Sequence, residues 1–120
     1  MRSAAFLGHA LTGQTRQAAL CAISLQRAFA AHNASDGAQP IRVRIGVHTG
    51  EAIKDAEKFF GKTVIQAFRI ADLASGEEIL TSSLTAELLR NAGDLRFDAE
   101  REVDLKGLEG RHRVYALNWR

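Results

Sequence analysis

The first residues that could do chemistry are 61–63, Gly-Lys-Thr, which resemble the end of the phosphate-binding loop G-x-x-x-x-G-K-[ST]. In that loop, backbone N–H groups and the lysine hold phosphate oxygens, and a second glycine precedes Gly61 by five residues. Here position 56 is Ala56, and residues 58–60 are Lys-Phe-Phe rather than a glycine-rich stretch. A phosphate-binding loop of this kind is therefore not predicted.

His48 and Glu51 form an H-x-x-E pattern at an expected turn, but no further ligand cluster joins them. A metal site needs more ligands than these two side chains, so none is predicted here. The other histidines are scattered: His9, His32 and His112. The single cysteine, Cys21, excludes an internal disulfide and favours a reducing, cytoplasmic setting. Its place in a helical pattern predicts a core residue.

Two basic residues lie in elements that the sequence predicts: Arg69 in a helix and Lys106 in a turn. Arg69 shares a face of a predicted helix with Ile65, four residues earlier. Lys106 lies in an L-K-G sequence where a turn is expected. By residue type and position alone, Arg69 is a solvated surface arginine and Lys106 a solvated turn lysine.

Length and composition indicate one ordinary globular domain. The chain has 120 residues, of which 46% are hydrophobic and 25% charged. Basic and acidic residues are interspersed at a net charge of +2, so no nucleic-acid-binding stripe is expected. No apolar run reaches the roughly 18 residues of a membrane helix. The first 14 residues lack the apolar core and cleavage site of a signal peptide.

Periodicity places helices and strands alternately along most of the chain. A helix is expected from Gly13 to His32, capped by Thr12, and a second one over residues 62–75, ended by Gly76. Between them, residues 42–50 alternate as a strand does. A short strand over residues 78–80 and a third helix, capped by Ser83 and stopped by Gly93, follow. The apolar faces expected are Ala18, Ala22, Leu25 and Phe29 in the first helix, and Val64, Ala67, Phe68, Ala71 and Ala74 in the second.

The end of the chain predicts two antiparallel strands. Apolar and charged residues alternate from Leu95 to Lys106, which is typical of a strand with one solvated face. A turn at residues 107–110 leads to a last strand over residues 113–119, and one more strand is possible near residues 4–11. Helices interleaved with a partly antiparallel sheet favour an α+β sandwich of the ferredoxin-like kind.

Four segments together resemble the class III nucleotidyl cyclases, the adenylyl and guanylyl cyclase family. RVRIGVHTGEAI resembles the family pattern V-R-V-G-I-H-x-G, and FFGKTVIQAFRIADLA resembles F-x-G-x-x-V-N-x-A-A-R-I-x-x-L-A. EILTSSLTAELL and REVDLKGLEGRHRVYAL match the strand, helix and closing hairpin that follow. The segments occur in the family's order from Ala18 onward, so we expect one cyclase-like domain over residues 1–120.

The resemblance implies a reaction and a set of site residues. The family converts a nucleoside triphosphate to a 3′,5′-cyclic nucleotide and pyrophosphate, in dimers with the active site between subunits. Its transition-state arginine falls on Arg69 and its triphosphate lysine on Lys106. The transition-state asparagine falls on Ile65, and the residue that reads the base falls on Lys58, so a preference for ATP or GTP is not predicted.

The family's two metal aspartates have no counterpart in this chain. One belongs to a strand that would precede Met1, and the other would fall near residues 4–6, Ala-Ala-Phe. No Asp or Glu occurs before Asp36. We therefore expect no tightly bound cofactor, although the family uses two Mg²⁺ or Mn²⁺ ions. In the family, the missing strand lies centrally in the sheet, so either residues 4–11 move into its place or two strands keep open edges.

These losses predict a chain that is inactive on its own. The alternatives are a pseudo-enzyme that binds or dimerises, and a partner subunit that lends Arg69 and Lys106 to an intact cyclase. Expected partners are a second cyclase domain, in a homodimer or heterodimer, and weakly a nucleoside triphosphate or pyrophosphate. Ile65 is expected to contact the other subunit rather than the core.

Overall fold

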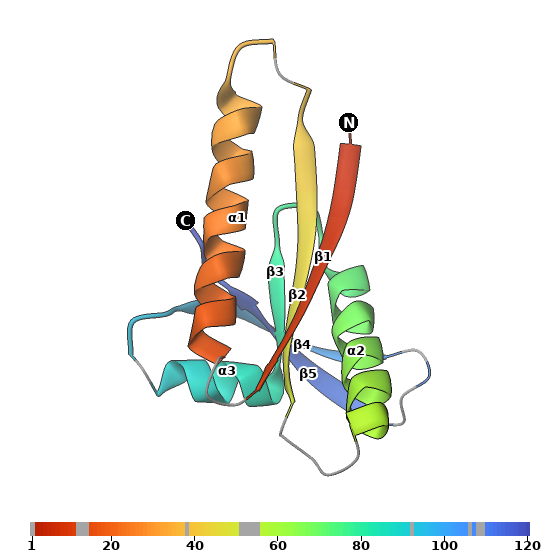
Figure 1. Ribbon diagram of the computed structural model, residues 1–120. Coiled ribbons are helices and arrows are strands. Elements are labelled where there is room, and N and C mark those ends of the chain that lie inside the picture. The colour runs from red at the N-terminus through yellow and green to blue at the C-terminus, as the bar shows by residue number, and fades with distance from the viewer. Residues whose placement is uncertain are drawn as a thin grey trace.

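The structure is a computed structural model that describes residues 2–11, 15–37, 39–50, 56–91, 93–105, 107 and 110–120. These residues form a mixed α+β fold with five strands and three helices (Figure 1). In chain order the elements are β1 (Arg2–Leu11), α1 (Thr15–Ala34), β2 (Ile41–Gly50), α2 (Ala56–Leu73), β3 (Ile79–Ser82), α3 (Ser83–Arg90), β4 (Phe97–Asp104) and β5 (Arg111–Leu117). The expected order of elements, including the strand at the start, is confirmed.

The five strands form one sheet in the order β1-β2-β3-β5-β4. β1, β2 and β3 are parallel, whereas β5 is antiparallel to both β3 and β4. β1 pairs with β2 over ten residues, from Arg2 opposite Ile41 to Leu11 opposite Gly50. Of the two arrangements expected for the first strand, the structure therefore has the one in which this segment moves in beside β2.

Helices cover both faces of the sheet, with α1 and α3 on one side and α2 on the other (Figure 1). Alternate residues of β2 divide between these faces. Val43, Ile45 and Val47 pack with Ala22 of α1 in one core cluster. The second cluster, under α2, joins Ile70 and Ala74 to Leu80, Val114 and Ala116. The β1-α1-β2 and β2-α2-β3 connections both move in the same direction along the sheet, but their helices cover opposite faces (Figure 1). The two connections therefore have opposite hands, and one of them departs from the right-handed norm.

α1 buries a slightly different face from the one expected. Its buried residues are Thr15, Ala19, Ala22, Ile23 and Gln26, while Ala18, Leu25 and Phe29 pack only partly against that core. Cys21 is exposed, so the prediction of a core cysteine was wrong. The predicted stripe was displaced by about one residue, because Ile23 and Gln26 occupy the centre of the buried face. The proposed cap at Thr12 lies outside the described residues.

α2 begins six residues before the predicted start at residue 62, and its expected face is partly wrong. Ala67, Ile70, Ala71 and Ala74 are buried, but Phe68 is 49% exposed. Gly76 is not a left-handed residue after the helix; Glu77 has the positive φ, at 72°. Gly76 is instead required by space, because a Cβ there would lie 2.9 Å from the Arg42 Cβ.

The corner between β3 and α3 differs from the prediction by one residue. Ser82, not Ser83, is the N-cap, and its Oγ accepts a hydrogen bond from the Thr85 N–H. Gly93 follows the helix with φ 78°, in keeping with its expected role in ending it. None of the helices in the described ranges is long and apolar enough to cross a membrane.

Candidate functional site

The candidate site lies on the outward face of α2. Ile65, Phe68 and Leu73 are 49%, 49% and 41% exposed, although all three are large apolar side chains. The spacing of three and five residues brings them to the side of the helix opposite the buried alanines. Arg69 lies among them, one turn after Ile65, so the expected shared face of Ile65 and Arg69 is present.

The inner face of α2 fixes how closely that site approaches the sheet. A Cβ at Gly46 of β2 would lie 2.5 Å from the Ala71 backbone N and 2.8 Å from the Ala67 carbonyl O. No side chain fits in that space, so α2 rests directly on the backbone of β2. The small residues Ala67 and Ala71 allow the same approach from the helix side. The position of Arg69 thus depends on three small residues in the layer beneath it.

Arg69 is half-buried beside a small hollow of about 110 Å³. Asp72 and Leu73 of α2 line the hollow with it, together with Asp104 and Leu105 at the end of β4. The Arg69 Cζ lies 5.9 Å from the centroid of the Phe68 ring, within the range of a cation–π contact. Its Nε is buried and has no hydrogen-bond partner among the described residues.

This geometry gives Arg69 a donor that an added acceptor could satisfy. A buried N–H without an acceptor is costly, so an anion at the hollow would gain from the contact. Asp72 and Asp104 line the same hollow, and their negative charges oppose an outside anion there. Sequence reasoning placed Phe68 on the buried face of the helix and did not single out Asp72 or Asp104. Only Asp72 could have been found, since it lies three residues after Arg69 on the same helix.

The structure describes only some of the other expected site residues. Lys58 belongs to the first turn of α2, eleven residues before Arg69. Lys106 lies outside the described residues, as does Glu51 of the H-x-x-E pattern. From the family resemblance we expect Lys58, Arg69 and Lys106 to converge near one cavity across a dimer, and this stays a prediction.

Comparisons with known proteins identify the fold and its family. The family model for the adenylate and guanylate cyclase catalytic domain matches residues 6–119. The chain belongs to this family. In the crystal structure of the guanylyl cyclase Cya2, a chain superposes with a TM-score of 0.69 and 26% sequence identity, over 87% of this chain and 57% of that one.

Two mycobacterial relatives are more similar in sequence. The uncharacterized proteins Rv0891c of Mycobacterium tuberculosis (strain ATCC 25618 / H37Rv) and Mb0915c of Mycobacterium bovis are each 40% identical over 100 residues, which is 83% of this chain. The chain spans about 30% of the length of these relatives.

The residues present do not fit the family's pair of metal ions. By the family resemblance, the second metal aspartate would fall near residues 4–6, which are Ala-Ala-Phe in β1. Alanine and phenylalanine side chains carry no oxygen that could bind Mg²⁺ or Mn²⁺. Among the described residues, no group of three His, Cys, Asp or Glu side chains comes together. We therefore derive no step through a metal ion for this chain.

Proposed function

We propose that this chain is a cyclase-family domain that does not cyclise nucleoside triphosphates on its own and acts through dimerisation. The family reaction requires attack of a ribose hydroxyl on an anionic phosphorus, so groups that offset the growing negative charge are needed. Residue 65 carries the proposal, because an isoleucine stands where the family's pattern has an asparagine.

The loss at Ile65 is large on the scale of a single catalytic group. Removing one donor aimed at a developing charge costs on the order of 10²–10³ in rate. Ile65 offers only hydrocarbon, and with 49% of its surface exposed it is not buried away from the outward face of α2. The family resemblance puts a metal aspartate near residues 4–6, which are Ala-Ala-Phe. Together with Ile65, this supports an inactive chain, although such losses are not additive.

The exposed side chain of Ile65 also supports a dimer. Ile65, Phe68 and Leu73 leave an apolar row on α2 that a second cyclase domain could cover. The family's active sites lie between two subunits, and a homodimer or a heterodimer would each bury this row. The half-buried Arg69 would then face the partner from the middle of the row.

The direct test is a cyclase assay on the purified chain. With ATP or GTP and either Mg²⁺ or Mn²⁺, we expect no more cyclic nucleotide than a heat-inactivated sample yields. Ile65→Asn, which restores the family residue at that position, is the matched variant and should also be inactive, because residues 4–6 still offer no side chain that could hold a metal ion. Metal-dependent product from the unaltered chain would contradict the proposal.

A second experiment separates a partner subunit from a binding module. An active cyclase whose transition-state arginine has been replaced would be mixed with this chain. A partner subunit would restore cyclic nucleotide formation, and Arg69→Ala would abolish the rescue. A module kept only for binding would form the mixed dimer without restoring activity.

A further inference from the structure

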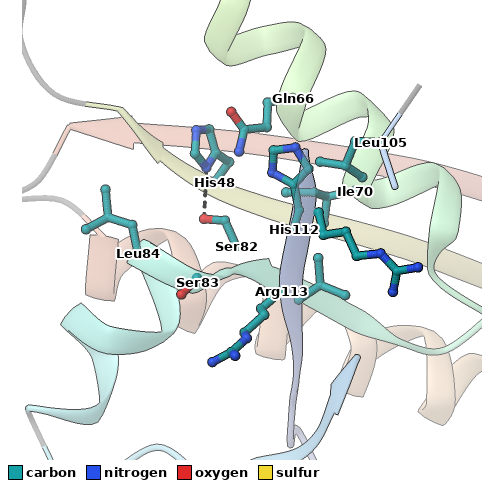
Figure 2. A pocket seen from close by; sticks show the side chains of 11 residues that line it. His48, Gln66, Ile70, Ser82, Ser83, Leu84, Leu105, His112 and Arg113 are labelled. Carbon is teal, nitrogen blue, oxygen red and sulfur yellow. Dashed lines mark hydrogen bonds between the residues drawn. The ribbon is translucent and has the colours of Figure 1, made fainter. Parts of the chain in front are cut away.

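A second and larger pocket, of about 330 Å³, is lined by Gln66 and Ile70 of the same helix but not by Arg69. Figure 2 shows this pocket from close by. His48 of β2, Ser82 of β3, His112 of β5 and Ile70 of α2 contribute to its lining. They come from four elements that are distant in sequence. A volume near 300 Å³ is at the lower end of the range of small-molecule sites in proteins.

The lining of this pocket is one-sided in charge. Two histidines, His48 and His112, and two arginines, Arg111 and Arg113, line it, whereas none of the described lining residues is acidic. Their acidic neighbours on β4 approach the arginines from outside the pocket: Arg113 lies 3.5 Å from Glu100, and Arg111 lies 3.9 Å from Glu102. Both arginine side chains remain more than 60% exposed, so these pairs are weak and the guanidinium groups can turn toward an anion.

One side chain of the pocket is held in place by a chain of buried hydroxyl groups. The His48 Nδ1 is hydrogen-bonded to the Ser82 Oγ at 2.8 Å (Figure 2). Ser82 in turn is hydrogen-bonded to the Thr85 Oγ1 at 2.8 Å, and Thr85 to the Thr49 Oγ1 at 2.9 Å. All three hydroxyl residues are buried. The imidazole is thereby held against the pocket by the interior of the protein, as a binding group should be.

The remaining wall is apolar, with Ile70, Leu105 and Val114 among its residues. Polar groups that converge beside an apolar wall are typical of sites for small organic anions. Arginine guanidinium groups pair with phosphate oxygens in a two-pronged manner, and imidazole and hydroxyl groups add single hydrogen bonds. We propose that this pocket binds a small phosphate-bearing molecule. The phosphate contacts the arginines and histidines, and the compact apolar part of the ligand lies against Ile70 and Leu105.

This site is separate from the one that carries the proposed function. Leu105 lines both hollows, but Arg69 lines only the smaller one and His48 only the larger one. Binding in the larger pocket requires neither a second cyclase domain nor the family reaction. The two proposals can therefore fail independently.

The test is an NMR titration of the whole ¹⁵N-labelled chain with phenyl phosphate and, in parallel, inorganic phosphate. We expect saturating shifts of the Ser82, Ser83 and Arg113 amide signals, with phenyl phosphate the tighter ligand because its ring covers the apolar wall. Arg113→Gln should weaken the affinity about fivefold or more. Arg96→Gln, the matched control, removes an exposed arginine that lies outside this pocket and should leave the affinity unchanged.

Three results would overturn the proposal. The first is the absence of shifts at these amides at 20 mM phenyl phosphate, roughly the weakest binding of interest. The second is equal shifts with acetate at the same ionic strength, which would indicate general screening. The third is binding that Arg69→Ala removes and Arg113→Gln leaves intact, which would place the phosphate at the other hollow. Because Arg113 is 63% exposed, its replacement by glutamine should leave the fold intact, and circular dichroism would check this.

Discussion

Replacing Gly46 with alanine should destabilise the protein far more than one added methyl group suggests. The new Cβ would lie 2.5 Å from the Ala71 N and 2.8 Å from the Ala67 O, both backbone atoms of α2. Ordinary contact between such atoms needs about 3.5 Å, so the helix must retreat by about 1 Å. No rotamer change can relieve this clash, because neither of the two atoms belongs to a side chain.

The cost follows from what α2 covers. A gap of 0.5–1 Å forfeits roughly a quarter to a half of the dispersion energy of the contacts it opens. Ile70 and Ala74 would lose contact with Leu80 and Val114 in the cluster under the helix. Overpacking of this kind costs about 1–3 kcal/mol, and we expect a value near the upper end, about 3 kcal/mol, since the clash is with a rigid helix backbone. For a chain of this size, that lowers the melting temperature by roughly 10 °C.

Urea unfolding, followed by circular dichroism, measures the loss. Gly37→Ala is the matched control, because no atom lies within 4 Å of the added Cβ but the residue has a φ of 74°. That variant carries only the cost of a left-handed alanine, about 1 kcal/mol. If both variants lose the same stability, the close approach of α2 to β2 is not what limits residue 46, and the packing argument fails.

Three further predictions concern the outward face of α2 and the surface. Ile65→Asp should weaken self-association at least tenfold, roughly the effect of losing the buried apolar area and burying a charge in the interface. Leu20→Asp on α1 is the control and should leave self-association unchanged. Sedimentation at tens of micromolar measures both variants, and a chain that is monomeric throughout refutes the dimer. Arg69→Ala should reduce weak, magnesium-independent binding of ATP, GTP and pyrophosphate alike, as measured by calorimetry at low salt; binding that needs Mg²⁺ would contradict this. The hydrogen bond and charge of Arg16 hold the pKa of Asp94 below its usual 3.8, so the pair should stabilise the fold above that pH and cease to do so as the pH falls through the lowered value. The stability difference between the native chain and Asp94→Asn should accordingly be small, because both groups are exposed, and should vanish in strong acid; a constant difference would argue against the ion pair.

The order of helices and strands could be predicted because each element carries its own periodicity. β2 shows this well, since Val43, Ile45 and Val47 alternate with side chains on the other face and are buried as expected. The family resemblance rested on residues in these same elements, and the match over residues 6–119 confirms it.

β4 shows where local pattern fails. Unbroken alternation from Leu95 to Leu105 predicted one apolar face, but the register shifts between Phe97 and Ala99. The bulge moves the apolar positions to the other face, so Phe97 packs against the α1 side while Val103 packs under α2. Alternation of apolar and charged residues in the sequence is unchanged at a bulge, so only the pairing of β4 with β5 reveals the bulge.

The two pockets could not be predicted for a different reason. His48, Ser82 and His112 are 34 and 30 residues apart along the chain and meet only because β2, β3 and β5 are near neighbours in the sheet. In the sequence, His48 belonged to an H-x-x-E pattern, Ser82 lay next to the predicted cap, and His112 was a scattered histidine. Likewise, Asp104 reaches the hollow of Arg69 from the end of β4, which no spacing within α2 could indicate.

The inner and outer faces of α2 can be changed independently of each other. The inner residues Ala67, Ile70 and Ala71 set the distance to the sheet, and a polar side chain at residue 65 would not disturb them, because that position is 49% exposed. Core packing therefore does not explain why residue 65 is apolar. An exposed isoleucine next to Phe68 is stabilising only if another surface covers it. By the family resemblance, Ile65 stands in place of a catalytic asparagine, and its exposed side chain offers contact area at the same point. The effect of Ile65→Asp on association is therefore the measurement that bears most directly on the proposed role of this domain.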